Sequence, residues 1–95
     1  MQHLVILRMR PDAAEDAVAA QRKAEVAKVW DYLAADVLRS IHFIPGPGAT
    51  FVLETADLPT AQAHVDALPM IREGLADAEV LPMTPFTGFA ALFAT

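Results

Sequence analysis

Cysteine is missing from this chain of 95 residues, and serine occurs only once, at Ser40. Disulfides, thiolate metal sites and cysteine nucleophiles are therefore excluded. The three histidines, at positions 3, 42 and 64, have no metal-ligand spacing, so we predict no metal site. GxGxxG, P-loop, HExxH and GxSxG motifs are all absent, which leaves no support for a nucleotide site, a zinc protease or a serine triad. We therefore expect the protein to use no cofactor.

Positive charge is scarce as well. Seven Lys and Arg residues face twelve Asp and Glu residues, and the net charge is −5. No basic cluster exceeds Arg22-Lys23, so nucleic-acid binding, which needs a basic face, is not expected. The longest stretch without a formal charge, Val80–Thr95, is too short to span a membrane. The apolar run near the amino terminus precedes its arginines, unlike a signal peptide. We expect a cytoplasmic protein without a membrane partner.

Apolar residues, by contrast, are in excess. They make up 55% of the chain, and the mean hydropathy is +0.35. The length allows one domain, over residues 1–95, and a domain of this size hides roughly 60–65% of its unfolded surface. One small core has no room for this much apolar material. The surplus is expected to face a partner subunit or to line a pocket for a small hydrophobic ligand.

The order of the apolar segments predicts a βαββαβ chain, because strands and helices alternate with clear turn signals between them. Asp12 and Glu15 resemble a capping box at the start of the first helix, and Pro45-Gly46-Pro47-Gly48 predicts a hairpin turn. The expected strands cover residues 4–9, 41–44, 50–55 and 78–83, and the expected helices cover 13–38 and 57–68, with a helical turn at 69–73.

The predicted fold is therefore α+β and ferredoxin-like. Right-handed crossovers place the first and third strands at the centre of a four-stranded antiparallel sheet, with two helices on one face. The first and third strands are apolar on both sides, so we predict that the free faces of two sheets pack together in a homodimeric α/β barrel or a larger homo-oligomer. The uncharged tail, residues 84–95, is predicted to pack across that dimer contact.

The long first helix has an apolar stripe with helical spacing. Its members are Val26, Val29, Trp30, Leu33 and Val37. This stripe predicts that Trp30 belongs to the core or to a pocket wall, and that Tyr32 lies on the outer side of the helix.

Several segments resemble muconolactone-isomerase-like members of the dimeric α/β-barrel superfamily. They are VLRSIHF, GATFVLETAD, ALPMIREGLADAEVLPMTPF and TGFAALF, within Val26 to Phe93. The most specific piece runs from Leu68 to Pro82 and describes a helix end, a glycine cap and a last strand. The resemblance implies the dimeric barrel fold and a pocket between each sheet and its helices. It carries over no catalytic motif, because function resides in the site rather than in the fold.

Six polar or aromatic residues are candidates for the site. As acid–base groups we consider His42 and Glu54 in apolar strands and His64 on the second helix. As substrate-binding groups we consider Arg8, Trp30 and Arg39. Five of them have a structural alternative: a hydrogen-bonded histidine at a sheet edge for His42, a solvated strand end for Glu54, a surface position for His64, a core or pocket-wall position for Trp30, and a helix-end contact for Arg39.

Three functions stay open. The first is a cofactor-independent isomerase or cyclase that moves a proton on a small hydrophobic carboxylate or lactone. The second is a cofactor-free oxygenase that uses Trp30 and a histidine in an apolar pocket. The third is a non-catalytic binding or assembly module of the same fold. A solvent-connected cavity with at least two titratable groups would favour an enzyme, and a solidly packed interior would favour the module.

Overall fold

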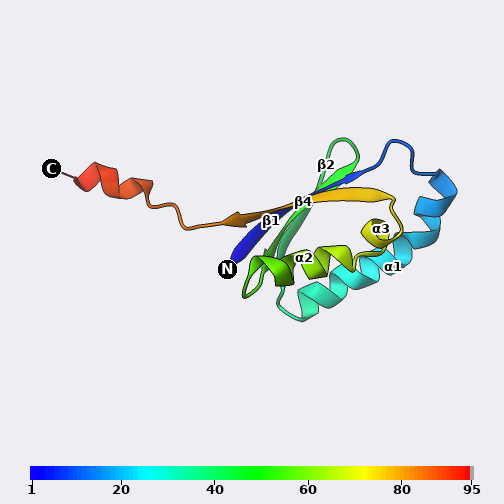
Figure 1. Ribbon diagram of the computed structural model, residues 1–95, viewed down its shortest axis with the longest axis horizontal. Coiled ribbons are helices and arrows are strands. Elements are labelled where there is room, and N and C mark those ends of the chain that lie inside the picture. Colours follow the sequence, from blue (N-terminus) through cyan, green and yellow to red (C-terminus); the bar gives the residue numbers. More distant parts are fainter. Residues whose placement is uncertain (95) are drawn as a thin grey trace.

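The computed structural model describes residues 1–94 of the chain (Figure 1). Within these residues it contains four strands, three α-helices and one short 3₁₀ helix. In chain order they are β1 (Gln2–Met9), α1 (Glu15–Ala34), β2 (Leu38–Ile44), β3 (Gly48–Glu54), α2 (Leu58–Asp66), α3 (Pro69–Arg72), β4 (Ala76–Met83) and the 3₁₀ helix η1 (Gly88–Phe93).

The four strands form one antiparallel sheet in the order β2-β3-β1-β4. The first and third strands are therefore central, as the crossover rule predicts. All three α-helices lie on one side of the sheet, and the other side is bare (Figure 1). The predicted ferredoxin-like α+β fold is confirmed.

The core lies between the helices and the sheet. Alternate residues of β1 point toward the helices, and Val5 and Leu7 are buried there beside Phe51 and Leu53 of β3. Val65 of α2 closes the core from the helix side. Burial of each such side chain contributes roughly 1.5–3 kcal/mol, so this layer holds the helices against the sheet.

The bare face of the sheet is apolar only at its centre. Leu4 and Ile6 of β1 point to this face, and the register places Val52 and Leu81 on either side of Leu4. Polar side chains take the outer positions, among them His42, which pairs with Thr50 at the β2 edge. The face therefore combines a small apolar centre with a polar border, and it is less uniformly apolar than the two-sided pattern predicted.

The predicted capping box at the start of α1 is wrong. The helix begins at Glu15, and its N-cap residue Ala14 makes no side-chain cap. Asp12 instead accepts a hydrogen bond from the Arg10 side chain at 3.1 Å, two residues away. Asp57 does cap α2, because its carboxylate accepts a hydrogen bond from the Thr60 backbone N–H at 2.8 Å.

The predicted inward face of α1 is also partly wrong. Trp30 is 65% exposed and Val26 is exposed, whereas Tyr32, expected outside, is only 7% exposed. The Tyr32 hydroxyl donates a hydrogen bond to the His64 carbonyl oxygen at 2.6 Å, so the tyrosine is buried with its polar end satisfied. The helix is rich in alanine and polar residues. Its sequence therefore contains two possible inward faces, one through Val26 and Trp30 and one through Tyr32.

The final segment leaves the sheet after Met83 and extends away from the domain (Figure 1). We call residues 84–94 the C-terminal arm; the last residue of the predicted tail, 95, lies outside the described residues. Among residues 1–94, no helix is both long and apolar enough to cross a membrane.

Candidate functional site

A cavity of about 390 Å³ lies between α1 and the sheet. Its walls come from β1, α1, β2, β3 and the segment around α3. Aliphatic, aromatic and methionine side chains form almost all of the lining, including Phe51 and Met70. Arg22 and Glu25 of α1 are the two charged residues that line it. The cavity is therefore an apolar site with one potential base and one potential anion anchor.

Glu25 is fixed by a contact from α3. Its Oε1 accepts a hydrogen bond from the Met70 backbone N–H at 2.9 Å. Within residues 1–94, the second carboxylate oxygen accepts no hydrogen bond and no cation lies within ion-pair distance. Burial raises the pKa of the Glu25 carboxyl above its ordinary value, and the Met70 hydrogen bond opposes part of that rise. A carboxyl in this environment exchanges protons closer to neutral pH than a surface glutamate does.

Arg22 precedes Glu25 by three residues, which puts the two side chains on neighbouring positions of one helix face. Arg22 is exposed and contacts both the cavity and the outside of α1. Its guanidinium makes no ion pair with any carboxylate of residues 1–94. Arg22 is therefore available to bind an anionic group at the entrance of the cavity.

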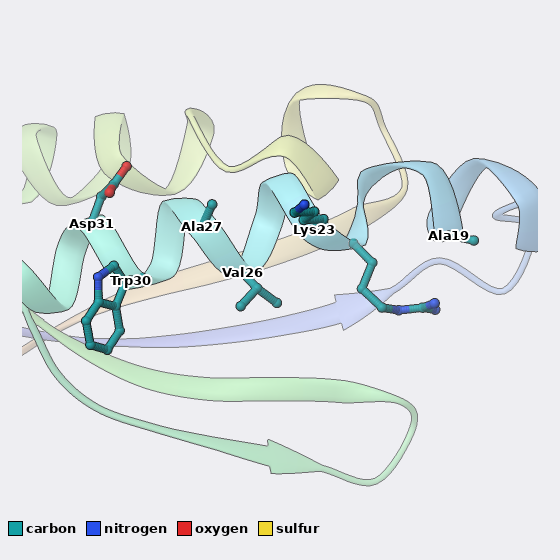
Figure 2. A pocket seen from close by; sticks show the side chains of 7 residues that line it. Ala19, Lys23, Val26, Ala27, Trp30 and Asp31 are labelled. Carbon is teal, nitrogen blue, oxygen red and sulfur yellow. The ribbon is translucent and has the colours of Figure 1, made fainter.

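A second depression, of about 690 Å³, runs along the outer side of α1. Figure 2 shows its lining side chains, with Val26 and Trp30 projecting from the same side of the helix. All of its lining residues belong to α1, so it lacks a second wall. The smaller cavity under the helix encloses a ligand better and is lined by the half-buried Glu25 carboxylate, and we therefore regard it as the candidate site.

Three of the sequence-predicted residues lie on the bare face of the sheet, away from this cavity. His42 is exposed on β2, and Arg8 lies at the far end of β1, opposite Gly48. Glu54 lies four residues along β3 from the partner of His42, a separation of about 13 Å. These three side chains are spread over the bare face and do not form one constellation.

Glu54 has a partner that the sequence did not suggest. Its Oε2 lies 2.7 Å from the Met1 ammonium nitrogen. That hydrogen-bonded ammonium group holds the pKa of the Glu54 carboxyl below its ordinary value, with a smaller contribution from Arg39. Arg39 itself makes an ion pair with Asp36, 3.2 Å away, near the end of α1. Glu54 and Arg39 therefore each form an ion pair with a partner outside the candidate cavity.

The last two predicted residues lie on the helices. His64 is half-buried on α2, and its ring meets the Tyr32 ring edge to face with centroids 4.9 Å apart. It does not line the candidate cavity. Trp30 stands outside, on the wall of the shallow depression (Figure 2).

Arg22 and Glu25 were missed at the sequence level. A signal was present, because Val18, Glu25, Val29 and Tyr32 recur at helical spacing, with a carboxylate among apolar residues. The other stripe, through Val26 and Trp30, contains larger apolar side chains, and it led to the wrong prediction of which side of α1 faces the sheet. Contacts with the sheet decide between the two stripes.

The fold places this chain among α+β proteins of the ferredoxin-like type. A solved structure with the same fold is the 5-chloro-2-hydroxyhydroquinone dehydrochlorinase TftG from Burkholderia phenoliruptrix AC1100, in complex with 2,5-dihydroxybenzoquinone. The two chains are 15% identical, the match covers 93% of this chain and 98% of the other, and the TM-score is 0.76. At this identity the similarity concerns the fold.

No protein-family model matches the sequence, and no curated protein matches it.

Proposed function

We propose that this protein is a cofactor-independent enzyme of the isomerase or cyclase type. It moves a proton on a small hydrophobic carboxylate or lactone, and Glu25 is the acid–base group. The observation that carries the proposal is the Glu25 carboxyl on the wall of an otherwise apolar cavity, with its pKa raised by burial. Arg22 gives the cavity lining a second charged group, which favours a ligand-binding site over a solidly packed interior.

The chemistry follows from the two charged groups. The Glu25 carboxylate takes a proton from a carbon next to a carbonyl, and the electron pair of that C–H bond moves into an enolate. Where a carbon–carbon double bond is conjugated with this enolate, protonated Glu25 returns the proton to the far carbon of that double bond, so one C–H bond forms for the one broken and the double bond shifts by one position. Arg22 binds the substrate carboxylate at the entrance and holds the ring in place.

The volume of the cavity also limits the size of the substrate. At about 390 Å³ it lies at the lower end of the range for small-molecule sites, which fits a compound with one ring. The structural neighbour TftG was solved with 2,5-dihydroxybenzoquinone, a ligand of that size.

The absence of cysteine and of a membrane-spanning helix among residues 1–94 supports placing the enzyme in the cytoplasm.

The oxygenase alternative loses its motivation, because neither Trp30 nor a histidine lines the described cavity. His42, Glu54 and Arg8 remain predictions for a site on the bare face of the sheet. A direct comparison of His42→Ala with Glu25→Gln separates the two locations, since only one of these side chains borders the cavity.

Proton exchange into deuterated water tests the proposal whatever the final product is. The purified protein is incubated in D₂O with a panel of single-ring lactones and carboxylates, and loss of C–H signals is followed by proton NMR. We expect exchange with the wild type and at least a hundredfold slower exchange with Glu25→Gln. Glu15→Gln, an exposed position on the same helix, serves as the matched control. Equal rates for the wild type and Glu25→Gln would contradict the role of Glu25. Ligand binding without any exchange would favour the binding module.

A further inference from the structure

The shallow depression on the outer side of α1 has an apolar lining but only one wall. Its apolar residues are Ala19, Val26, Ala27 and Trp30, and the two large ones, Val26 and Trp30, are exposed. Figure 2 shows Val26 and Trp30 on one side of the helix and Ala27 and Asp31 on the other. Large apolar side chains exposed together on one helix gain free energy when another surface covers them.

Two opposite charges lie at equal distances from the middle of this depression. Lys23 precedes Ala27 by four residues, and Asp31 follows Ala27 by four residues. Each is therefore about 6 Å from Ala27 along the helix axis. Both side chains are exposed, and neither makes an ion pair with a charged group of residues 1–94. We call Lys23, Ala27, Trp30 and Asp31 the outer α1 surface.

The charge spacing makes the outer α1 surface complementary to itself in one orientation. In a two-fold contact between parallel helices each residue faces its own copy, so Lys23 would meet Lys23 and Asp31 would meet Asp31. Such like-charge contacts are unfavourable. Antiparallel helices with Ala27 at the two-fold axis instead place Lys23 of each copy opposite Asp31 of the other. Two ion pairs then form, and the helix dipoles oppose each other.

The side-chain sizes fit the same orientation. Ala27 is small, so the two helix axes can approach to the usual packing distance of about 8–10 Å. Trp30 lies three residues beyond Ala27 and then comes beside Lys23 of the other copy, whose aliphatic stem and ammonium group both suit an indole ring. The second α1 supplies the missing wall of the depression. An unrelated protein would need the same charge spacing, so the favoured occupant is a second copy.

We propose that two copies of this protein associate by antiparallel packing of their α1 helices, centred on Ala27. The bare face of the sheet lies on the opposite side of the domain (Figure 1), so this contact leaves that face free for the sheet-to-sheet packing predicted above. Two such contacts in one protein build an assembly larger than a dimer. The α1 contact goes beyond the acid–base role proposed for Glu25, which does not line the outer depression.

Introduced cysteines test the contact and its register, because the chain has no cysteine of its own. In full-length Ala27→Cys the two Cα atoms would lie about 4–5 Å apart, within the range of a disulfide. Oxidised glutathione should therefore cross-link the copies, as followed by non-reducing electrophoresis. Ala20→Cys is the matched control, since Ala20 is exposed on the same side of α1 but its two copies would be about 21 Å apart. We expect it to cross-link about tenfold more slowly.

A mixture of two variants checks the antiparallel register. Residue 20 of one copy should lie opposite residue 34 of the other, because both are seven positions from Ala27. Ala20→Cys and Ala34→Cys, the latter with a larger affinity tag, should form a mixed disulfide at a rate comparable to that of Ala27→Cys. Both positions are exposed, so the fold should be retained, and circular dichroism checks this.

Charge exchange tests the recognition itself. In the Ala27→Cys chain, Lys23→Asp should slow cross-linking about tenfold, because four carboxylates then face one another. Lys23→Asp combined with Asp31→Lys should restore the rate. Three results would each overturn the proposal: no cross-linking of Ala27→Cys, equal rates for Ala27→Cys and Ala20→Cys, or no recovery in the exchanged variant. No ligand is used, so a failed role of Glu25 would leave these results unchanged.

Discussion

The Glu25 carboxylate accepts a hydrogen bond from the backbone N–H of Met70 across 45 positions of sequence, at 2.9 Å. This contact joins the middle of α1 to the first turn of α3 at the wall of the cavity. It fixes one carboxylate oxygen and leaves the other without a hydrogen bond from residues 1–94. The residue proposed for proton transfer is thus held in place by the packing of two helices.

The stability of the protein should report the raised pKa of Glu25. Burial favours the protonated carboxyl in the folded state, so the folded state binds more protons than the unfolded state between the ordinary pKa and the raised one. The contribution of Glu25 to stability is therefore full below the ordinary pKa of glutamate. It falls as the pH rises through the raised pKa.

Urea unfolding of the wild type and of Glu25→Gln at a series of pH values measures this contribution. The difference between their free energies of unfolding should change in favour of Glu25→Gln as the pH rises from the ordinary glutamate range toward neutrality. Glu15→Gln should show no such trend, because Glu15 is exposed. A pH-independent difference for Glu25→Gln would show that burial does not perturb this carboxyl.

Arg22→Gln should weaken the binding of carboxylates specifically. A ligand carboxylate and its methyl ester, compared by calorimetry, should differ in their response: the acid should lose about tenfold in affinity, or ~1.4 kcal/mol, and the ester should lose little. Lys23→Gln is the matched control, since Lys23 neighbours Arg22 on α1 but does not line the cavity. Equal losses for acid and ester would mean that Arg22 does not bind the anion.

A buried leucine and an exposed leucine should differ sharply in how much stability is lost when each is replaced by alanine. Leu53 is fully buried in β3, so Leu53→Ala should lower the free energy of unfolding by about 2–5 kcal/mol through lost burial and a cavity. Leu58, at the start of α2, is exposed, and Leu58→Ala should cost less than about 1 kcal/mol. Denaturant titrations at one protein concentration check both values, and similar losses would contradict the assigned core.

The apolar centre on the bare face of the sheet should control self-association. We predict that the wild type dimerises through this face. Leu4→Lys places a charge between Val52 and Leu81 and should weaken that dimer by more than tenfold while circular dichroism stays unchanged. Gln2→Lys adds the same charge at the polar end of that face and should have a much smaller effect. Sedimentation equilibrium measures both dissociation constants. A Leu4→Lys protein that associates like the wild type would exclude packing through this face.

The sequence determined the ferredoxin-like topology almost completely. Continuous apolar strands and the Pro45–Gly48 turn are local signals, and both appear in the structure close to where they were predicted. The predicted glycine cap is also found in the structure, because Gly74 adopts a positive φ of +71° after α3. Such signals are reliable because hydrogen bonding and backbone sterics act over a few neighbouring residues.

The location of the site was decided by tertiary packing. An alanine-rich helix such as α1 has no single dominant apolar face, so its own sequence could not fix which side meets the sheet. Contact with the sheet turned Glu25 and Tyr32 inward and left Trp30 outside, because the burial of a whole helix face outweighs the preference of one aromatic residue. His42, Glu54 and Arg8 lie on the bare face of the sheet, because side chains alternate along each strand and the register, rather than the residue type, fixes which face each one occupies.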